Sequence, residues 1–462
     1  MSSDAPSSEA WSPDSWRAKE AAQSVSYADP AGLAAAVEKL RSLPPLVTSW
    51  EVERLRTQIA DAQEGKRFVL QGGDCAEMLS DCRPERISNK LKILLQMSLV
   101  LVHGTTKPVV RLGRFAGQYA KPRSSRMEHR TNGLGEEVAL PSYFGDLVNR
   151  TPFTPEARTA DPWLLVEAYQ HAAMTLNFIR SLSDGGFADL HHPEQWDLSF
   201  MEHASLPAAL RDEYHRTSQQ LAEALRFMEA LGETSVDELS RVTFFTSHEG
   251  LNLHYESAQT RTVPRRAGYW DLTAHLPWIG ERTRQLEGAH VEFFRGIQNP
   301  VGIKIGPTCT PEELLRLTDL LNPTNARGKI VLISRLGATR VADALPALVR
   351  AMRQEGRRVL WISDPMHGNT KSTESGIKTR SFDDIVSEIE QVMDVHDAEG
   401  TVFGGVHFEL TGEDVTECIG GGAGVTEADL ETNYESGCDP RLNYRQALEM
   451  AFHIARRFRA AR

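Results

Sequence analysis

The stretch Val301–Pro365 reads VGIKIGPTCTPEELLRLTDLLNPTNARGKIVLISRLGATRVADALPALVRAMRQEGRRVLWISDP, and its pattern decides the fold. Three short apolar runs, VGIKIGP, IVLISRLG and VLWISDP, are rich in branched residues, as buried strands are. Between them lie two longer stretches with apolar residues at helical spacing, the first beginning at a threonine that can cap a helix. This order of strand and helix predicts parallel strands joined by crossover helices.

The same alternation continues on both sides of this stretch. Eight apolar runs are expected to be strands: Arg67–Asp74, Lys107–Gly117, Val242–Gly250, Trp270–Gly280, Val301–Pro307, Ile330–Gly337, Val359–Pro365 and Gly404–Gly412. Eight parallel strands, most of them followed by a helix, predict an α/β fold of the (β/α)8, or TIM, barrel type over residues 67–462. The alternation also allows a doubly wound open sheet, which is the less favoured alternative.

Two further regions are expected outside the barrel itself. Residues 1–66 form an N-terminal helical extension, of which about the first 20 residues are Ser-, Pro- and Asp-rich and are expected to be mobile. An insertion after the second strand, about residues 150–235, is expected to hold a pair of helices. The four expected helices of these regions are Pro30–Leu43, Ser49–Gly65, Pro162–Leu182 and Ser218–Gly232.

The composition excludes several classes of protein. The 462 residues carry a formal net charge of −12, whereas a general nucleic-acid binder usually has a basic face. The apolar runs are too short to cross a membrane, and the start MSSDAPSSEAW does not resemble a signal peptide, so a cytoplasmic protein is expected. The five cysteines are too few, and odd in number, for a disulfide framework.

Metal-binding residue types follow the strands that would be neighbours in a closed barrel. Cys75 follows the first strand, His367 follows the seventh and Glu409 lies in the eighth, while Asp439 lies on a later loop. Active sites of such barrels lie at the carboxyl ends of the strands, so these side chains could form one divalent metal site. Each alone is as readily a core or turn residue, but their convergence favours a site. Mixed sulfur, nitrogen and oxygen ligands suit Mn²⁺, Fe²⁺, Co²⁺ or Zn²⁺ better than Mg²⁺ or Ca²⁺.

Basic residues gather at the same strand ends. They are Arg114, Lys121 and Arg123 after the second strand, Arg282 and Arg284 after the fourth, Lys304 in the fifth and Arg335 at the end of the sixth. Lys304 lies between two isoleucines of a barrel strand, where a buried ammonium needs anionic partners. The pattern indicates phosphorylated or carboxylated ligands beside a metal that polarises a carbonyl or stabilises an enolate.

Several long motifs are similar to those of one known family. They are LQGGDCAE, GRFAGQYAKPRS, HLPWIGERTRQLEGAHVEF, NPVGIKIGP, SDPMHGNT, HFELTGEDVTECIGG and CDPRLN. In this order they closely resemble the type II, or plant-like, 3-deoxy-D-arabino-heptulosonate 7-phosphate (DAHP) synthases, from about Trp11 to the C-terminus. The resemblance implies a (β/α)8 barrel. It also implies a transferase, 3-deoxy-7-phosphoheptulonate synthase, that condenses phosphoenolpyruvate with erythrose 4-phosphate and water to give DAHP and phosphate, the first step of the shikimate pathway.

The resemblance also assigns residues. It implies the metal ligands Cys75, His367, Glu409 and Asp439, with Mn²⁺ or Co²⁺ expected first and Zn²⁺, Fe²⁺ or Cd²⁺ as alternatives. It implies a phosphoenolpyruvate site of Arg114, Glu281, Arg282, Lys304 and Arg335, and an erythrose 4-phosphate site of Lys121, Arg123 and Ser124. Lys304, Glu281 and His367 are the expected catalytic residues.

The resemblance leaves the second substrate, the oligomeric state and the regulation open. Phe144 stands where many relatives carry a basic residue, which leaves room for an aminoDAHP synthase or a DAHP synthase of secondary metabolism. A metal-dependent ketose-phosphate aldolase and a non-catalytic homologue are the rival interpretations. A homodimer or homotetramer is expected, with aromatic amino acids as effectors and a chorismate mutase as a partner of some relatives. A disulfide between Cys75 and Cys438 in metal-free protein is a further hypothesis.

Overall fold

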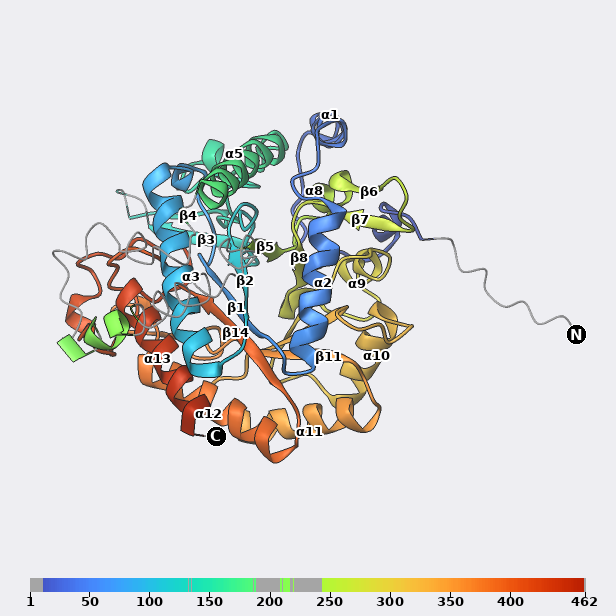
Figure 1. The fold of residues 1–462 in the computed structure, drawn as a ribbon. Coiled ribbons are helices and arrows are strands. Elements are labelled where there is room, and N and C mark those ends of the chain that lie inside the picture. The colour runs from blue at the N-terminus through green and yellow to red at the C-terminus, as the bar shows by residue number, and fades with distance from the viewer. Residues whose placement is uncertain are drawn as a thin grey trace, which may run out of the picture.

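Eight parallel strands form a closed barrel in this protein (Figure 1). The computed structural model describes residues 11–131, 133, 135–185, 187, 208–209, 211–216, 219 and 243–460. The barrel strands, in their order around it, are β1 (Phe68–Gly73), β14 (Phe403–Glu409), β11 (Val359–Ser363), β10 (Ile330–Ser334), β9 (Val301–Ile305), β8 (Leu276–Ile279), β5 (Phe244–Glu249) and β2 (Val109–Arg114). The (β/α)8 fold and the eight expected strands are confirmed.

The expected fourth strand is shorter than its sequence suggested. The run Trp270–Gly280 divides into β7 (Tyr269–Asp271), which pairs with β6 (Thr260–Thr262), and the barrel strand β8. The Asp271 carboxylate accepts hydrogen bonds from the backbone N–H and the hydroxyl of Thr273, at 3.1 and 2.7 Å. This local turn competes with strand pairing and ends β7 before the barrel begins.

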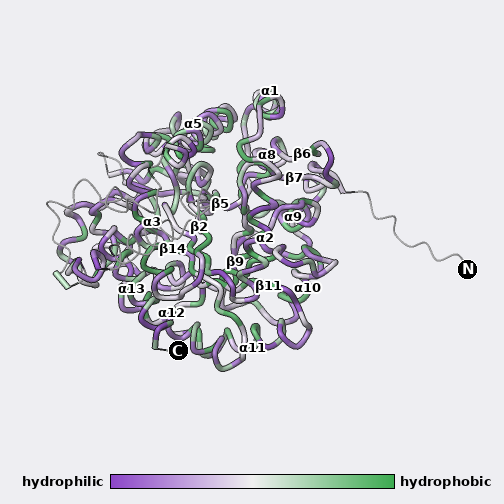
Figure 2. The backbone as a smooth tube through the Cα atoms, viewed as in Figure 1, coloured by the Kyte–Doolittle hydropathy of each residue, from purple (hydrophilic) through white to green (hydrophobic). Residues whose placement is uncertain are grey.

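Helices surround the barrel, as Figure 1 shows. The outer helices are α3 (Pro84–Thr105), α8 (Leu253–Gln259), α9 (Ala289–Phe294), α10 (Pro311–Leu321), α11 (Val341–Gln354), α12 (Phe382–Ala398) and α13 (Tyr444–Ala460). Figure 2 shows hydrophobic residues along the barrel strands and an alternation of hydrophobic and hydrophilic residues along the outer helices. No helix among the described residues is long and apolar enough to cross a membrane.

Helix α2 (Ser49–Gln63) closes the amino end of the barrel. Its side chains Leu55, Ile59 and Ala62 are fully buried in one cluster with inward-facing strand residues such as Val69. At the end of this helix the Gln63 side chain hydrogen-bonds backbone groups just before β10 and β11, at 3.0 and 3.1 Å. The barrel is therefore closed at this end, and its carboxyl end is left for a site.

The N-terminal extension contains helices and contacts the barrel from residue 11 onward. Helix α1 (Pro30–Ser42) and α2 confirm the two expected helices, and the short η1 (Ser15–Ala18) precedes them. The Trp11 ring lies 5.2 Å from the Tyr269 ring, and its indole N–H donates to the Glu292 carbonyl at 2.9 Å. Trp11 is therefore in contact with the barrel, whereas residues 1–10 lie outside the described part, and the expected mobility of about the first 20 residues stays a prediction.

The inserted region is described only in part. Helices α4 (Pro155–Arg158) and α5 (Leu164–Asp184) follow the hairpin of β3 (Met127–Thr131) and β4 (Glu137–Pro141). Helix α5 confirms the first expected helix and packs on α1 and α3. The second expected helix, Ser218–Gly232, lies outside the described residues except for Gln219. Further short elements are η2 (Leu79–Asp81), η4 (Glu281–Thr283), β12 (Lys371–Ser372), β13 (Lys378–Thr379) and η5 (Glu427–Asp429).

Candidate active site and metal centre

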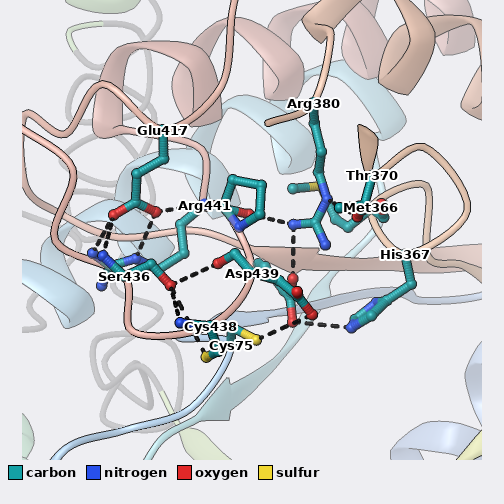
Figure 3. Close-up of polar contacts among 12 residues, drawn as sticks. Cys75, Met366, His367, Thr370, Arg380, Glu417, Ser436, Cys438, Asp439 and Arg441 are labelled. Carbon is teal, nitrogen blue, oxygen red and sulfur yellow. Dashed lines mark hydrogen bonds and ion pairs between the residues drawn. The ribbon is translucent and has the colours of Figure 1, made fainter. Parts of the chain in front are cut away.

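The four expected metal ligands meet at the carboxyl end of the barrel. Strands β1 and β14 pair with Gly73 opposite Glu409, so Cys75 comes directly beside that carboxylate. Ligand atoms of Cys75, Glu409 and Asp439 all lie within 4.8 Å of one another. His367 joins them, because its Nε2 lies 3.0 Å from Glu409 Oε1. Figure 3 shows the labelled members Cys75, His367 and Asp439 pointing toward one another.

The donor set and its surroundings fit a divalent transition metal. The His367 Nδ1 lies 2.7 Å from Asp364 Oδ2, an arrangement that orients Nε2 toward Glu409 and the other candidate ligands. Burial would raise the pKa of Glu409, but the charges of His367 and Arg380 outweigh it and hold this pKa well below its usual range. One sulfur, one imidazole and two carboxylates are ligands that Mn²⁺, Co²⁺, Fe²⁺ and Zn²⁺ accept.

The pKa of the sulfur ligand is shifted in the opposite direction to that of Glu409. Burial, and then the neighbouring Cys438 and Glu409, raise the pKa of the Cys75 thiol well above its usual value. A divalent cation stabilises the thiolate and reverses this preference. Cys75 and Cys438 are both free thiols, and their sulfurs lie side by side in Figure 3.

The loop that carries Asp439 is fixed by a buried arginine. The Arg441 guanidinium binds Glu417 at 2.8 Å and Asp74 at 2.7 Å, and Figure 3 shows the Glu417 part of this network. Asp74 directly precedes Cys75, so one ion-paired side chain joins the loops of two candidate ligands. Such a network fixes the position of the Asp439 loop relative to the Cys75 loop.

Cationic side chains line the cavity next to these ligands. A cavity of about 130 Å³ is lined by Arg114, Arg282 and Lys304, together with the four candidate ligands. It adjoins one of about 240 Å³ that Arg335 also lines. Arg114 is buried and lies 3.2 Å from Glu409 Oε1. The expected phosphoenolpyruvate residues are thus brought to one place.

Lys304 is buried in this cavity beside an acidic partner. Its ammonium forms an ion pair with Asp364, and the Trp278 ring centroid lies 5.8 Å away. Burial, partly offset by Asp364, lowers the pKa of Lys304 to about 8. The ammonium can therefore give up a proton near neutral pH.

The expected erythrose 4-phosphate residues lie beside the metal ligands. Lys121, Arg123 and Ser124 line the smaller cavity. The Lys121 ammonium lies 2.7 Å from Cys75 Sγ and 2.8 Å from Asp439 Oδ2. A cation at this position can contact both a metal-bound ligand and the substrate next to it.

Two residues of the expected basic and acidic sets, Glu281 and Arg284, are hydrogen-bonded to each other. Glu281 lines the larger cavity, but its carboxylate accepts hydrogen bonds from Gly306 N–H at 2.7 Å and from Arg284 at 3.0 Å. Arg284 also pairs with Glu313 and does not line either cavity. Arg284 is therefore not brought to the site.

Phe144 does not line either of these cavities. It lines a mostly apolar cavity with Trp16, Val25 and Leu251, and Lys121 lines both this cavity and the smaller cavity of the site. Its backbone carbonyl accepts a hydrogen bond from Lys121 N–H at 2.9 Å. The side chain that departs from the family pattern therefore does not line the cavity of the site, and its backbone supports Lys121.

The structure adds residues that the sequence analysis missed. Glu249, the last residue of β5, lines both cavities, and burial raises its pKa. The strand-end rule that identified Cys75 could have identified it. Lys378 of β13 binds Asp439 Oδ1 at 2.9 Å, and the fully buried Arg380 binds Glu409 Oε2 at 2.7 Å. Lys378 lies in the short hairpin of β12 and β13 and Arg380 directly follows it, and this hairpin has no clear signal in the sequence.

Comparison with known proteins identifies the family of this chain. The model of the class-II DAHP synthetase family matches residues 11–455. A phospho-2-dehydro-3-deoxyheptonate aldolase of Neurospora crassa is 49% identical, with 99% of this chain and 96% of that protein covered. A protein of the same name from Streptomyces coelicolor is 46% identical over 96% of this chain and 97% of its own. AroG of Mycolicibacterium smegmatis, which has the same name, is 42% identical over 96% of this chain and 94% of its own.

A match over nearly the full length, with the family's motifs at the carboxyl end of one barrel, leaves a single assignment. This chain belongs to the class-II DAHP synthetase family.

Proposed function

We propose that this protein is a metal-dependent DAHP synthase. It would condense phosphoenolpyruvate with erythrose 4-phosphate and water and release phosphate. One observation carries the proposal: four metal-binding side chains and a set of cations share one cavity at the carboxyl end of the barrel. The names of the relatives support the same reaction.

The cations would hold phosphoenolpyruvate. The Arg114 and Arg335 guanidinium groups suit phosphate and carboxylate, because each presents two parallel N–H donors. Lys304 adds a third charge from a buried strand. Holding both anionic groups directs C3 of phosphoenolpyruvate toward the aldehyde and makes the attack effectively unimolecular.

The metal site would activate the second substrate. A divalent ion held by Cys75, His367, Glu409 and Asp439 would polarise the aldehyde carbonyl and make its carbon electrophilic. Lys121, 2.8 Å from Asp439, is positioned to give a proton to the oxygen of that carbonyl as the bond forms.

The remaining steps need a base and an acid. As C3 attacks, positive charge develops at C2, water adds there, and phosphate leaves from the resulting hemiketal. Within the described residues, Glu249 Oε1 is buried without a hydrogen-bond partner, and burial raises its pKa, so it is our candidate to take the proton from water. Lys304, with a pKa of about 8, is our candidate to protonate the leaving phosphate.

Two variants test whether His367 binds the metal and whether Lys304 binds phosphoenolpyruvate. His367→Ala should lose metal binding, measured by calorimetry with Mn²⁺, and with it phosphoenolpyruvate consumption. Lys304→Ala should keep metal binding and raise the KM for phosphoenolpyruvate. Lys39→Ala, an exposed lysine of α1, is the matched control and should behave as wild type. Equal metal affinity in His367→Ala and wild type would contradict the proposed ligand set.

The alternatives make different products. A ketose-phosphate aldolase would not release phosphate from phosphoenolpyruvate. An aminoDAHP synthase would prefer an amino sugar phosphate, and competition between the two aldoses measures this preference directly.

The other expectations are proposals of the same kind. We propose a cytoplasmic homodimer or homotetramer that is inhibited by aromatic amino acids. Light scattering measures the mass in solution, and inhibition by phenylalanine, tyrosine and tryptophan can be measured in the same assay.

A further inference from the structure

Gln23, in the N-terminal extension, reaches the loop that carries the expected sugar-phosphate residues. Its side-chain Oε1 accepts a hydrogen bond from the backbone N–H of Arg123 at 2.8 Å, across 100 residues of sequence. Gln23 also has a φ of +61°, in the left-handed region that residues other than glycine seldom adopt. This backbone conformation costs free energy, so the surrounding contacts must impose it.

The segment around Gln23 is held on both sides. We call residues 11–29 the N-terminal strap. Before Gln23, Trp16 is buried with its ring 5.0 Å from the His254 ring, and the Glu20 carbonyl accepts a hydrogen bond from Ala289 N–H at 2.9 Å. After Gln23, the Tyr27 hydroxyl accepts a hydrogen bond from the Asn252 side chain at 3.0 Å. The strap is therefore fixed to α8 and α9, and Gln23 projects from a rigid base.

The loop that Gln23 contacts has no regular secondary structure. Residues 121–124 follow β2 without forming a helix or strand, and Lys121, Arg123 and Ser124 all line the cavity beside the metal ligands. The N–H of Lys121 is held by the Phe144 carbonyl at 2.9 Å, and that of Arg123 is held by Gln23. The two bonds fix the backbone on either side of Pro122, and so the direction in which both cationic side chains leave the loop.

We propose that Gln23 is a positioning residue for the second substrate, acting through the Arg123 backbone. This inference rests on the proposed function, because it assigns residues 121–124 to the aldose phosphate. A fixed loop binds a phosphate without first losing conformational freedom, so loss of the Gln23 acceptor weakens sugar-phosphate binding. Arg114 lies on β2 and Glu409 on β14, whereas Cys75, His367 and Asp439 lie on other loops, so the contacts of these residues with one another do not depend on Gln23.

Three variants separate the hydrogen bond from the backbone strain. Gln23→Met keeps the length of the side chain and removes the acceptor, whereas Gln23→Glu keeps an acceptor oxygen. Gln23→Gly removes the acceptor and also relieves the strain of the positive φ, so its Tm should not fall below that of Gln23→Met. The KM for erythrose 4-phosphate should rise about fivefold in the Met and Gly variants and return toward wild type in the Glu variant. The KM for phosphoenolpyruvate and the Mn²⁺ affinity should be unchanged in all three.

A purely structural role for Gln23 gives a different result. Both KM values would then move together, or change in proportion to the loss of Tm, and either outcome overturns the proposal. An unchanged KM for erythrose 4-phosphate in Gln23→Met overturns it as well.

Hydrogen exchange separates this inference from the proposed function. The amides of residues 123–126 should exchange faster in Gln23→Met than in wild type and in Gln23→Glu, and equal rates overturn the proposal whatever the activity. Failure of the wild-type protein to consume phosphoenolpyruvate, with the expected exchange difference present, refutes the proposed reaction and leaves the loop contact established.

Discussion

Asp364 is the residue that connects the metal ligands to the cationic cavity. It is fully buried, and its Oδ2 contacts both His367 Nδ1 and the Lys304 ammonium. Its Oδ1 accepts hydrogen bonds from the backbone N–H groups of Met366 and His367, at 3.0 and 3.3 Å. One carboxylate therefore orients a metal ligand, fixes its loop and neutralises a buried lysine.

Asp364→Asn should damage the metal site more than its small change in shape suggests. The amide no longer balances the His367 and Lys304 charges, so we expect metal affinity to fall about tenfold to a hundredfold. Calorimetric titration with Mn²⁺ measures this. Asp319→Asn, at an exposed position of α10, is the control. Wild-type affinity in Asp364→Asn would show that this aspartate does not orient the ligand.

The two neighbouring thiols, Cys75 and Cys438, are expected to form a disulfide on oxidation. A hydrogen bond with Cys75, and then the Lys121 ammonium, lower the pKa of Cys438 against the effect of burial. A thiolate beside a second sulfur is the arrangement that oxidises to a disulfide. Mild oxidation after chelation should therefore join Cys75 to Cys438 and block metal binding, and Cys438→Ser should prevent this. Mass spectra with only free thiols would refute the hypothesis.

Among the elements, α12 fixes two strand-end loops through one buried glutamate. Glu388 accepts hydrogen bonds from Leu336 and Gly337 N–H, which follow Arg335, and from the Asn369 side chain, which follows His367. Burial raises the pKa of Glu388 to about 7. This folded-state pKa lies above the unfolded value. Between about pH 4.5 and 7 the folded protein therefore keeps a proton on Glu388 that the unfolded chain releases.

This proton has a defined effect on stability. The contribution of protonated Glu388 is fully present below the unfolded pKa and is lost as the pH rises through about 7. Relative to Glu388→Gln, the wild-type free energy of unfolding should be higher at pH 5 than at pH 8 by about 3 kcal/mol. Urea unfolding of both proteins at the two pH values measures the difference. Parallel pH profiles would contradict the raised pKa.

Helix α2 makes a prediction about packing. Ile59→Ala removes buried methyl groups from the cluster that closes the barrel and should cost about 2–5 kcal/mol of unfolding free energy. Thr57→Ala, on the exposed face of the same helix, should change it by less than about 0.5 kcal/mol. Equal effects in chemical denaturation would mean that α2 does not support the barrel.

The elements also show what the sequence could predict. The barrel strands carry local apolar runs and the helices carry their spacing, so both could be located without a structure. An amphipathic pattern identifies a buried face and not its partner, so α2 was predicted as a helix but not as the closure of the barrel. The short hairpin of β12 and β13 has no apolar run, and Lys378 and Arg380 were missed with it.

At the scale of the whole molecule, closure of the barrel brings distant residues together. Strand neighbours implied that Cys75, His367 and Glu409 meet, because their positions follow from strand order alone. The contact of Gln23 with Arg123 depends on tertiary packing of the N-terminal strap and could not be predicted. Although the chain has a net charge of −12, cationic side chains line one of its cavities. This local positive charge makes the cavity suited to anionic substrates.

The most direct test of the proposed function measures phosphoenolpyruvate and phosphate together. With erythrose 4-phosphate and Mn²⁺ or Co²⁺ present, we expect one phosphate released for each phosphoenolpyruvate consumed. Consumption should stop on addition of a chelator and resume when metal is restored. No consumption with either metal, or consumption that a chelator does not affect, would contradict a metal-dependent DAHP synthase.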